Sequence, residues 1–164
     1  MVAPYPTASI FPLTLCDLYS CWALDQRCFD GFEVYELSTF RMLLTCEDSI
    51  ALKIVEVDGE MKGFLVGMID RNAFNMLCGS AHIIAVGVAP ESRGRGYGNW
   101  LMDEAERAFG RAGVTILHLE VRVTNEVALR MYEKLGYVIT ERRSRYYANG
   151  EDGYKMVKEL RIEN

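Results

Sequence analysis

Residues 93–98 combine three glycines and two arginines in a turn between an apolar segment and an amphipathic one. Such a turn leaves backbone N–H groups unpaired at the start of a helix, where the helix dipole also attracts anions. Gly94, Gly96 and Gly98 allow the backbone to approach a phosphate closely, while Arg93 and Arg95 add positive charge. The segment therefore predicts a binding site for a pyrophosphate.

Two other phosphate-binding motifs do not fit this turn. Its glycine spacing, Gly94-x-Gly96-x-Gly98, differs from the Gly-x-Gly-x-x-Gly of dinucleotide-binding folds, and its strand does not open the chain. The Gly-Lys-Ser/Thr of a nucleoside-triphosphate loop is absent from the sequence. A tight turn that binds no ligand remains the structural alternative.

Glu120 is a second candidate for chemistry. The alternation of apolar and polar residues over 116–123 predicts a strand with Ile116, His118, Glu120 and Arg122 on one face. Glu120 then lies near the carboxyl end of the strand, where open α/β sheets bind ligands. Burying a carboxylate in an otherwise apolar strand is costly, which favours a functional role.

Tyr132 falls on the apolar stripe of the helix predicted next, together with Ala128, Met131 and Leu135. Its ring should point toward the core, where its hydroxyl needs a partner. A hydrogen-bonded core tyrosine and a catalytic tyrosine are both compatible with this position.

The elements that must position these residues form an α/β pattern. An antiparallel front half and a β-α-β-α-β back half predict a mixed sheet covered by helices on both faces. Thr14 and Asp17 form a capping-box pattern at the first helix, and Asp58-Gly59 marks a hairpin. Helices are predicted over 14–29, 36–45, 97–112 and 125–135, and strands near residue 10 and over 50–57, 61–70, 81–88, 115–123, 137–145 and 153–158.

The composition restricts the classes of protein to which the chain can belong. Its 164 residues, 50% of them hydrophobic, suit a single domain over 1–164 with one sizeable core. The net charge of −5 argues against a nucleic-acid partner bound through bulk positive charge. The sequence shows neither a membrane-length apolar run nor a signal-peptide pattern, so we expect a cytoplasmic protein without a membrane partner.

The five cysteines are odd in number and lack the paired spacing of a zinc site. His82 and His118 are the only imidazoles that could join them. We therefore expect reduced core thiols and no metal. The alternative is that Cys21 or Cys28 acts as a nucleophile, but the sequence offers neither cysteine a base at motif spacing.

Three blocks within residues 80–157 resemble the GNAT acetyltransferase superfamily. Arg93-x-x-Gly96-x-Gly98 is similar to its acyl-CoA-binding motif. The segment 119–137 and the paired tyrosines in 142–156 resemble the N-terminal protein acetyltransferases of the ribosomal-protein-alanine (RimI) and archaeal Ard1 type. The resemblance implies a GNAT fold, with a mixed sheet of six to seven strands flanked by about four helices.

The same resemblance implies acetyl-CoA as the acetyl donor, Glu120 as general base and Tyr132 as general acid. The pyrophosphate would lie on the 93–99 turn and the pantetheine along the backbone of 86–88, with a further contact from Asn125. The implied acyl-CoA contacts are Val86, Gly87, Val88, Arg93, Gly94, Arg95, Gly96, Tyr97, Gly98, Asn99 and Asn125.

The implied reaction is direct attack of a neutral α-amine on the thioester. With a pKa of about 8, roughly a tenth of an α-amine is neutral at pH 7, whereas a lysine ε-amine costs about 3 kcal/mol more. We expect burial to raise the pKa of Glu120, so that it accepts the amine proton directly or through water. A backbone N–H near Val88 would stabilise the oxyanion, and Tyr132 would assist the departing thiolate mainly as a hydrogen-bond donor.

Aromatic residues are candidates for the wall of the peptide entrance. They are Phe29, Phe32 and Tyr35 in the first interhelix loop, with Tyr146 and Tyr147 farther along; their alternative role is packing. Many bacterial members of the subfamily carry Pro-Trp in that loop, and this chain does not, so acceptors beginning with Ala, Ser, Met or Thr stay open. A small amine, a lysine side chain, or acyl-CoA binding without catalysis are the alternative functions.

Charge is unevenly distributed along the chain. Residues 1–92 carry 5 basic and 12 acidic side chains, whereas residues 93–164 carry 13 and 11. The basic excess begins at the predicted phosphate turn, and the acidic front half would attract cationic acceptors. We see no long helical extension that would dock a partner, so we expect a monomer or weak dimer.

Overall fold

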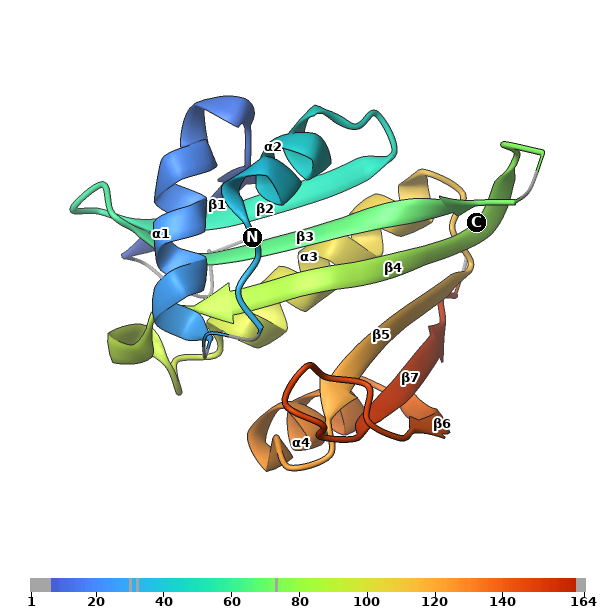
Figure 1. Cartoon of the computed structure of the whole chain (residues 1–164). Helices are drawn as coiled ribbons and strands as arrows, with labels where there is room; N and C mark the ends of the chain where they lie inside the picture. The colour runs from blue at the N-terminus through green and yellow to red at the C-terminus, as the bar shows by residue number, and fades with distance from the viewer. Residues whose placement is uncertain (1–6, 30, 32, 73, 162–164) are drawn as a thin grey trace.

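The computed structural model describes residues 7–29, 31, 33–72 and 74–161. Its strands are β1 (Ala8–Pro12), β2 (Ser49–Glu56), β3 (Met61–Arg71), β4 (Leu77–Val88), β5 (Ile116–Arg122), β6 (Val138–Arg143) and β7 (Gly153–Glu159). Its α-helices are α1 (Leu18–Cys28), α2 (Leu37–Thr45), α3 (Tyr97–Arg111) and α4 (Glu126–Lys134). One mixed sheet has the order β1-β2-β3-β4-β5-β7-β6, with helices on both faces (Figure 1).

The predicted elements are confirmed, with small shifts at their ends. The first helix starts as a 3-10 turn over Leu15–Asp17, and Asp17 accepts the backbone N–H of Thr14 at 2.9 Å, as the capping pattern predicts. β4 begins earlier than predicted because the β3 pairing extends back to Leu77. β6 ends before Arg145, whose φ of 50° is incompatible with a strand.

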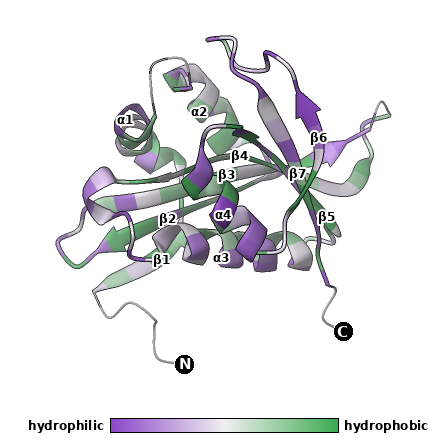
Figure 2. Ribbon diagram, turned by 90° about the horizontal axis from the view of Figure 1, so that it is seen from below, coloured by the Kyte–Doolittle hydropathy of each residue, from purple (hydrophilic) through white to green (hydrophobic). Residues whose placement is uncertain are grey.

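Two apolar clusters lie on opposite faces of the sheet. One lies against α3 and α4 and includes Leu101, Phe109 and Leu119, while the other lies against α1 and α2 and includes Phe40 and Phe64. Figure 2 shows polar residues on the sides of α3 and α4 that face away from the sheet. None of the described helices has the length and apolar character that crossing a membrane requires.

The two halves of the sheet are joined by a short parallel contact. β4 then continues to Val88 paired with β3 alone, and β5 continues to Arg122 paired with β7 alone. The two strands therefore diverge into a V (Figure 1), and each arm has a backbone edge without a neighbouring strand. The β4–β5 register pairs are Ser80 with Ile116, Ala81 with Leu117, and His82 with His118.

A β-bulge lies where β4 leaves β5. Val66 pairs with Ala85 whereas Gly67 pairs with Ile83, so Ile84 is the additional residue. A bulge bends its strand and increases its twist. Side chains also change faces across it, because Ile83 packs in the α3 cluster and Ala85 in the α1–α2 cluster. The bend accounts for the separation of the two strands immediately after the last register pair.

Candidate active site

Glu120 lies inside the V, just beyond the last β4–β5 register pair. Its Oε2 is 2.5 Å from His82 Nε2, and its Oε1 accepts a hydrogen bond from Arg143 Nη1 at 3.0 Å. The Glu120 side chain is only 10% exposed. Both carboxylate oxygens are thus engaged at the vertex, by residues from β4 and β6.

The expectation that burial raises the pKa of Glu120 is wrong. Burial does favour the neutral carboxyl, but the hydrogen bond from His82 and the charges of His82, Arg143 and His118 together lower the pKa. Glu120 is therefore an ionised acceptor, and His82 Nε2 donates to it. This assignment leaves Nδ1 of His82 as the nitrogen that can take up a proton.

A second carboxylate–imidazole pair lies beside the first. His118 Nε2 is 2.7 Å from Asp70 Oδ2, which also accepts a hydrogen bond from Ser80 Oγ at 2.6 Å. The rings of His82 and His118 stack, with 4.7 Å between centroids and 10° between planes. Our sequence reasoning missed this pairing, although strand alternation had placed His118 on the same face as Glu120.

Nitrogen and oxygen atoms of His82, His118 and Glu120 lie within 4.8 Å of one another. A zinc ion would require lone pairs that converge on one point at about 2 Å. The two nearly parallel rings direct their lone pairs along separate planes, so at least one ring would have to turn. The arrangement as it stands is not a preformed metal site.

The predicted phosphate turn has an open helix start. Gly96 is the N-cap of α3 with φ of 84°, and no side chain accepts a hydrogen bond at this cap. Gly94 has φ of 77° and open space around the position of a Cβ atom. Both conformations favour glycine, and the first N–H groups of α3 have no acceptor within the helix.

Three side chains of this turn have partners that the sequence did not predict. Arg93 donates to the carbonyl oxygens of Val88 at 3.2 Å and Cys28 at 3.1 Å, and so joins β4 to α1. Arg95 pairs with Glu56 at 2.9 Å, and the buried Tyr97 donates its hydroxyl to the same carboxylate at 2.7 Å. The Tyr97 side chain is thus part of the core, and the predicted contact of Tyr97 with acyl-CoA would have to come from its backbone.

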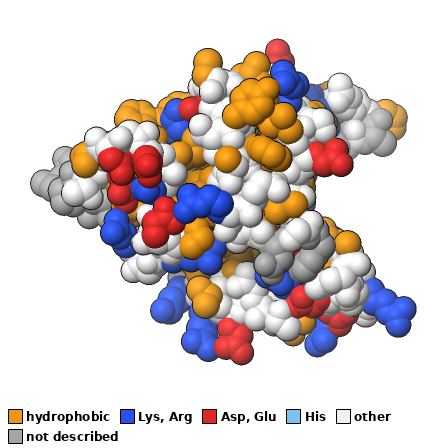
Figure 3. All heavy atoms as spheres, turned by 60° about the vertical axis from the view of Figure 1, so that its left-hand side comes forward, with side chains coloured by type: hydrophobic (Ala, Val, Ile, Leu, Met, Phe, Trp, Pro, Cys, Tyr) orange, Lys and Arg blue, Asp and Glu red, His pale blue; other side chains and the backbone are white. Residues whose placement is uncertain are grey.

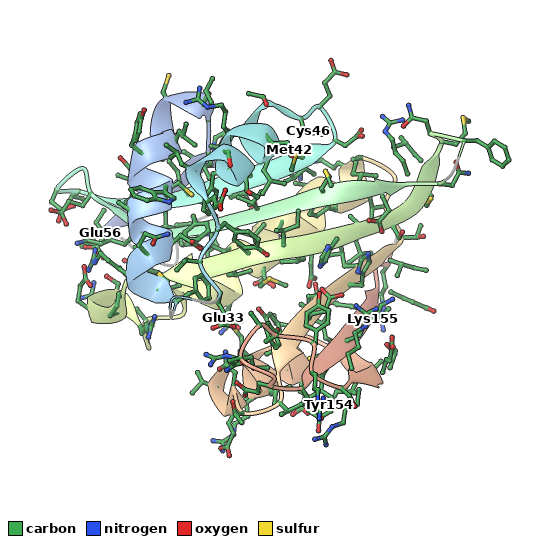
Figure 4. All side chains as sticks on the ribbon, viewed as in Figure 1. Glu33, Met42, Cys46, Glu56, Tyr154 and Lys155 are labelled. Carbon is green, nitrogen blue, oxygen red and sulfur yellow. The ribbon has the colours of Figure 1, made fainter. Side chains whose placement is uncertain are left out.

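The surface around the turn mixes both signs of charge. Figure 4 places Glu56 beside the turn, and Figure 3 shows Lys and Arg side chains interspersed with Asp and Glu on this side of the molecule. The positive charge predicted for Arg95 is therefore largely offset by Glu56. Backbone N–H groups remain the main anion-binding feature of the turn.

The other predicted donor contacts surround the V. Val86, Gly87 and Val88 lie on the arm of β4 that pairs with β3 but not with β5. A Cβ at Gly87 would lie 2.5 Å from Phe64 Cε1, so this glycine is required for packing. A Cβ at Gly98 would lie 3.0 Å from Met131 Sδ of α4, which makes Gly98 a helix-packing residue as well. Asn99 is exposed in the first turn of α3, and Asn125 caps α4 by accepting the Ala128 N–H at 3.2 Å.

Tyr132 is 8% exposed and packs edge-on against Tyr137, with 5.8 Å between ring centroids. Burial raises the pKa of Tyr132 to about 12. Full proton transfer from this phenol to a thiolate whose conjugate acid has a pKa of about 8.5 would be uphill by about 5 kcal/mol. A hydrogen bond is the assistance that this hydroxyl can give.

Three tyrosines predicted for the peptide entrance have partners in the structure. Tyr35 donates its hydroxyl to the Ile84 carbonyl at 3.3 Å, which fixes the α1–α2 loop on the β4 bulge. Tyr146 and Tyr147 pack edge to face, with 5.0 Å between their centroids. Burial raises the pKa values of all three, and the charge of Glu120 contributes to each.

Phe29 is the one predicted phenylalanine that lies within the described residues. Phe29 packs in the α1–α2 cluster, which supports the alternative of packing. Phe32 lies outside the described residues.

Sequence reasoning also missed the polar residues that hold the α1–α2 loop. Glu33 Oε1 is 3.0 Å from Arg122 Nε, and Figure 4 shows Glu33 between the loop and the β5–β7 half. The buried Asp25 accepts the backbone N–H of Tyr35 at 2.9 Å. Burial raises the pKa of Asp25 to about 6, and the charge of Glu33 adds to the effect.

The cysteine alternative is not supported. Cys28 donates its thiol to the Val88 carbonyl at 3.3 Å, and burial raises its pKa to about 11. Burial also raises the pKa of Cys21. Neither thiol has the lowered pKa that a nucleophilic cysteine needs.

Comparison with known proteins agrees with this geometry. Residues 17–137 match the model of the Acetyltransferase (GNAT) family. The chain is 32% identical over 120 residues to an N-alpha-acetyltransferase of Sulfurisphaera tokodaii, covering 70% of this chain and 72% of that protein. It is 36% identical over 106 residues to an uncharacterized N-acetyltransferase of Methanocaldococcus jannaschii, a match that covers 64% of either chain.

The fold has a similar match among solved structures. The ribosomal-protein-S18-alanine N-acetyltransferase of Escherichia coli superimposes with a TM-score of 0.82 at 24% identity, covering 96% of both chains. This likeness confirms the predicted fold of a mixed sheet flanked by four helices. With its family match over most of the sequence, the chain belongs to the GNAT acetyltransferase family.

Proposed function

We propose that this protein transfers the acetyl group of acetyl-CoA to the N-terminal α-amino group of a protein or peptide in a ternary complex. The observation that carries the proposal is the ionised Glu120, hydrogen-bonded to His82 at the vertex of the V. The vertex adjoins the open edge of β4, and the charge of Glu120 at the vertex acts on Tyr35, Tyr146 and Tyr147.

Acetyl-CoA supplies the activated thioester. The unpaired backbone edge of β4 over 86–88 would hold the pantetheine arm by strand-like hydrogen bonds. The first N–H groups of α3, over 94–98, would receive the pyrophosphate. Asn99 and the amide nitrogen of Asn125 would add contacts, since the cap of α4 uses the oxygen of Asn125.

The acceptor amine would enter between Tyr35, Tyr146 and Tyr147 and reach the Glu120–His82 pair. Glu120 orients His82, and the pair takes up the proton that the amine loses as it attacks the thioester. A backbone N–H near Val88 would stabilise the oxyanion. Tyr132 would donate a hydrogen bond to the departing thiolate, in accord with its raised pKa.

The test is turnover with acetyl-CoA and a panel of peptides that differ in their first residue. We expect Glu120→Gln to lower kcat by about 10²- to 10⁴-fold and Tyr132→Phe to lower it by about tenfold. Glu126→Gln is the matched control, because that exposed side chain pairs with Arg130 on the surface of α4. Undiminished turnover in both site variants would overturn the assigned roles.

The same panel decides the class of acceptor. It includes peptides with a blocked N-terminus and an internal lysine, a polyamine, and the N-terminus of a ribosomal protein. We place the reaction in the cytoplasm, in keeping with the five free cysteines. If only the polyamine or only the internal lysine is acetylated, that amine is the acceptor and the α-amine is not.

A further inference from the structure

We propose that His118, held by Asp70 and Ser80, is a positioning residue that fixes the His82 ring against Glu120. This inference rests on the proposed function for its kinetic consequence, and on the geometry of two neighbouring imidazoles for its structural one. His118 itself touches Asp70 and His82 and lies behind the pair that meets the acceptor.

The two pairs form a brace across three strands. His82 on β4 reaches Glu120 on β5, and His118 on β5 reaches Asp70 on β3. The brace lies at the last β4–β5 register pair, where the backbone contact between the two halves of the sheet ends. Side chains at this point therefore determine how β5, with Glu120, sits relative to the open arm of β4.

The hydrogen-bond pattern of His118 fixes its ring. Its Nδ1 is buried and has no hydrogen-bond partner among the described residues. An unpaired lone pair costs less than an unpaired N–H, so the proton belongs on Nε2 and is donated to Asp70. Asp70 is in turn held by Ser80 at 2.6 Å. These hydrogen bonds hold the His118 ring in one orientation, and the face of that ring supports His82.

The support matters because the His82 ring could rotate without it. Its side chain is 32% exposed, and its Nε2 is bonded to the single acceptor Glu120. Stacking on His118 restricts rotation of the ring about its terminal torsion, which is broad for histidine. Loss of the support would let His82 leave Glu120, and with it the hydrogen bond that helps to keep Glu120 ionised.

Other charged groups near Glu120 set the background for this effect. Arg143 of β6 pairs with Glu120 at 3.0 Å, and Lys155 of β7 is its register partner. Tyr35 from the α1–α2 loop, together with Tyr146 and Tyr147, completes the surroundings. None of these groups changes in a His118 variant. The charge of His118 also acts on Glu120, but His118→Ala and His118→Phe remove it equally, so a difference in titration between these two variants would be traceable to His82.

The first experiment needs no acceptor. The chain has two histidines, so His118→Ala leaves His82 as the only imidazole. In ¹⁵N-labelled protein we expect wild-type His82 to show one tautomer, with a hydrogen-bonded Nε2–H. His118→Ala should show averaged tautomers, whereas His118→Phe should keep the single tautomer because its ring preserves the stack.

The second experiment uses the pH dependence of acetyl transfer. We expect His118→Ala to lower kcat at least tenfold with an unchanged KM for acetyl-CoA, and to move the acid limb of kcat/KM to higher pH. His118→Phe should restore most of kcat and return the acid limb most of the way to its wild-type position. Ile116→Ala, on the same face of β5, is the control for a general disturbance of the strand and should leave the limb in place.

The outcomes separate this inference from the proposed function. If wild-type protein acetylates no α-amine but the tautomer of His82 depends on the ring at 118, the proposed acceptor is wrong and the positioning role stands. A folded His118→Ala protein with wild-type His82 spectra and an unmoved acid limb would overturn the positioning role.

Discussion

At the scale of single residues, the chemistry of this site depends on partners rather than on residue types alone. Glu120 was identifiable as an unusual carboxylate in an apolar strand, but its partners reverse the expected direction of its pKa shift. Two donors, from His82 and Arg143, satisfy its oxygens. The base that we propose is thus a carboxylate–imidazole pair in which Glu120 stays charged.

Arg143 provides a test at this scale. Because its guanidinium favours the ionised form of Glu120, Arg143→Leu should raise the pKa of that carboxyl. In the proposed reaction Glu120 acts in its ionised form, so activity should be lost at a higher pH on acidification. The acid limb of kcat/KM should move up by about one pH unit.

The control for this prediction is Arg142→Leu. The exposed Arg142 pairs with Asp152 instead of Glu120. Its replacement should therefore leave the acid limb of kcat/KM unchanged. An acid limb that stays in place, or moves to lower pH, in Arg143→Leu would show that Arg143 does not control the ionisation of Glu120.

At the scale of elements, the site results from two strands that separate. Three register pairs hold β4 to β5, and the bulge at Ile84 turns β4 away. Glycines then allow the neighbours of β4 and α3 to approach closely, because Phe64 and Met131 occupy the space of a Cβ atom at Gly87 and Gly98. This close packing explains why both positions are glycine.

Gly87 and Gly110 give opposite predictions at this scale. Gly87→Ala would place a Cβ within 3.1 Å of both Phe64 and Cys28, so we expect a loss of about 1–3 kcal/mol in the free energy of unfolding. Gly110 lies in α3 with open space around its Cβ position, so Gly110→Ala should add about 0.5–1 kcal/mol. Urea unfolding measures both changes, and equal effects at the two positions would contradict the packing argument.

At the scale of the whole molecule, charge is distributed in a way that the sequence count only partly describes. The basic excess after residue 93 does coincide with the phosphate turn, but Arg95, Arg122 and Arg143 are already paired with carboxylates. The net charge of −5 therefore acts as a general field rather than through one patch.

This field predicts that salt weakens binding of a cationic acceptor. Raising KCl from about 20 to about 300 mM shortens the Debye length from roughly 20 to roughly 6 Å. We expect the acceptor KM to rise severalfold while kcat stays constant, with a steeper rise for a peptide that carries additional lysines. A KM independent of salt, or one that falls, would rule out electrostatic attraction of the acceptor.

The sequence by itself determined the elements and the faces of their residues. Periodicity gave the four helices and seven strands, and alternation placed His118 and Glu120 on one face of β5. The glycine turn was also predictable, because positive φ at Gly94 and Gly96 is a local requirement. These are properties of residues that are close together in the chain.

The tertiary structure alone decided which of these residues meet. The insertion of β7 between β5 and β6, the separation of β4 from β5, and the contact of His82 with Glu120 across 38 positions all depend on strand register and on one bulge. The partners of Arg93, Arg95 and Arg143 follow from the same arrangement. Local periodicity specifies a face, whereas the direction of the Glu120 pKa shift requires the charges that other strands bring to it.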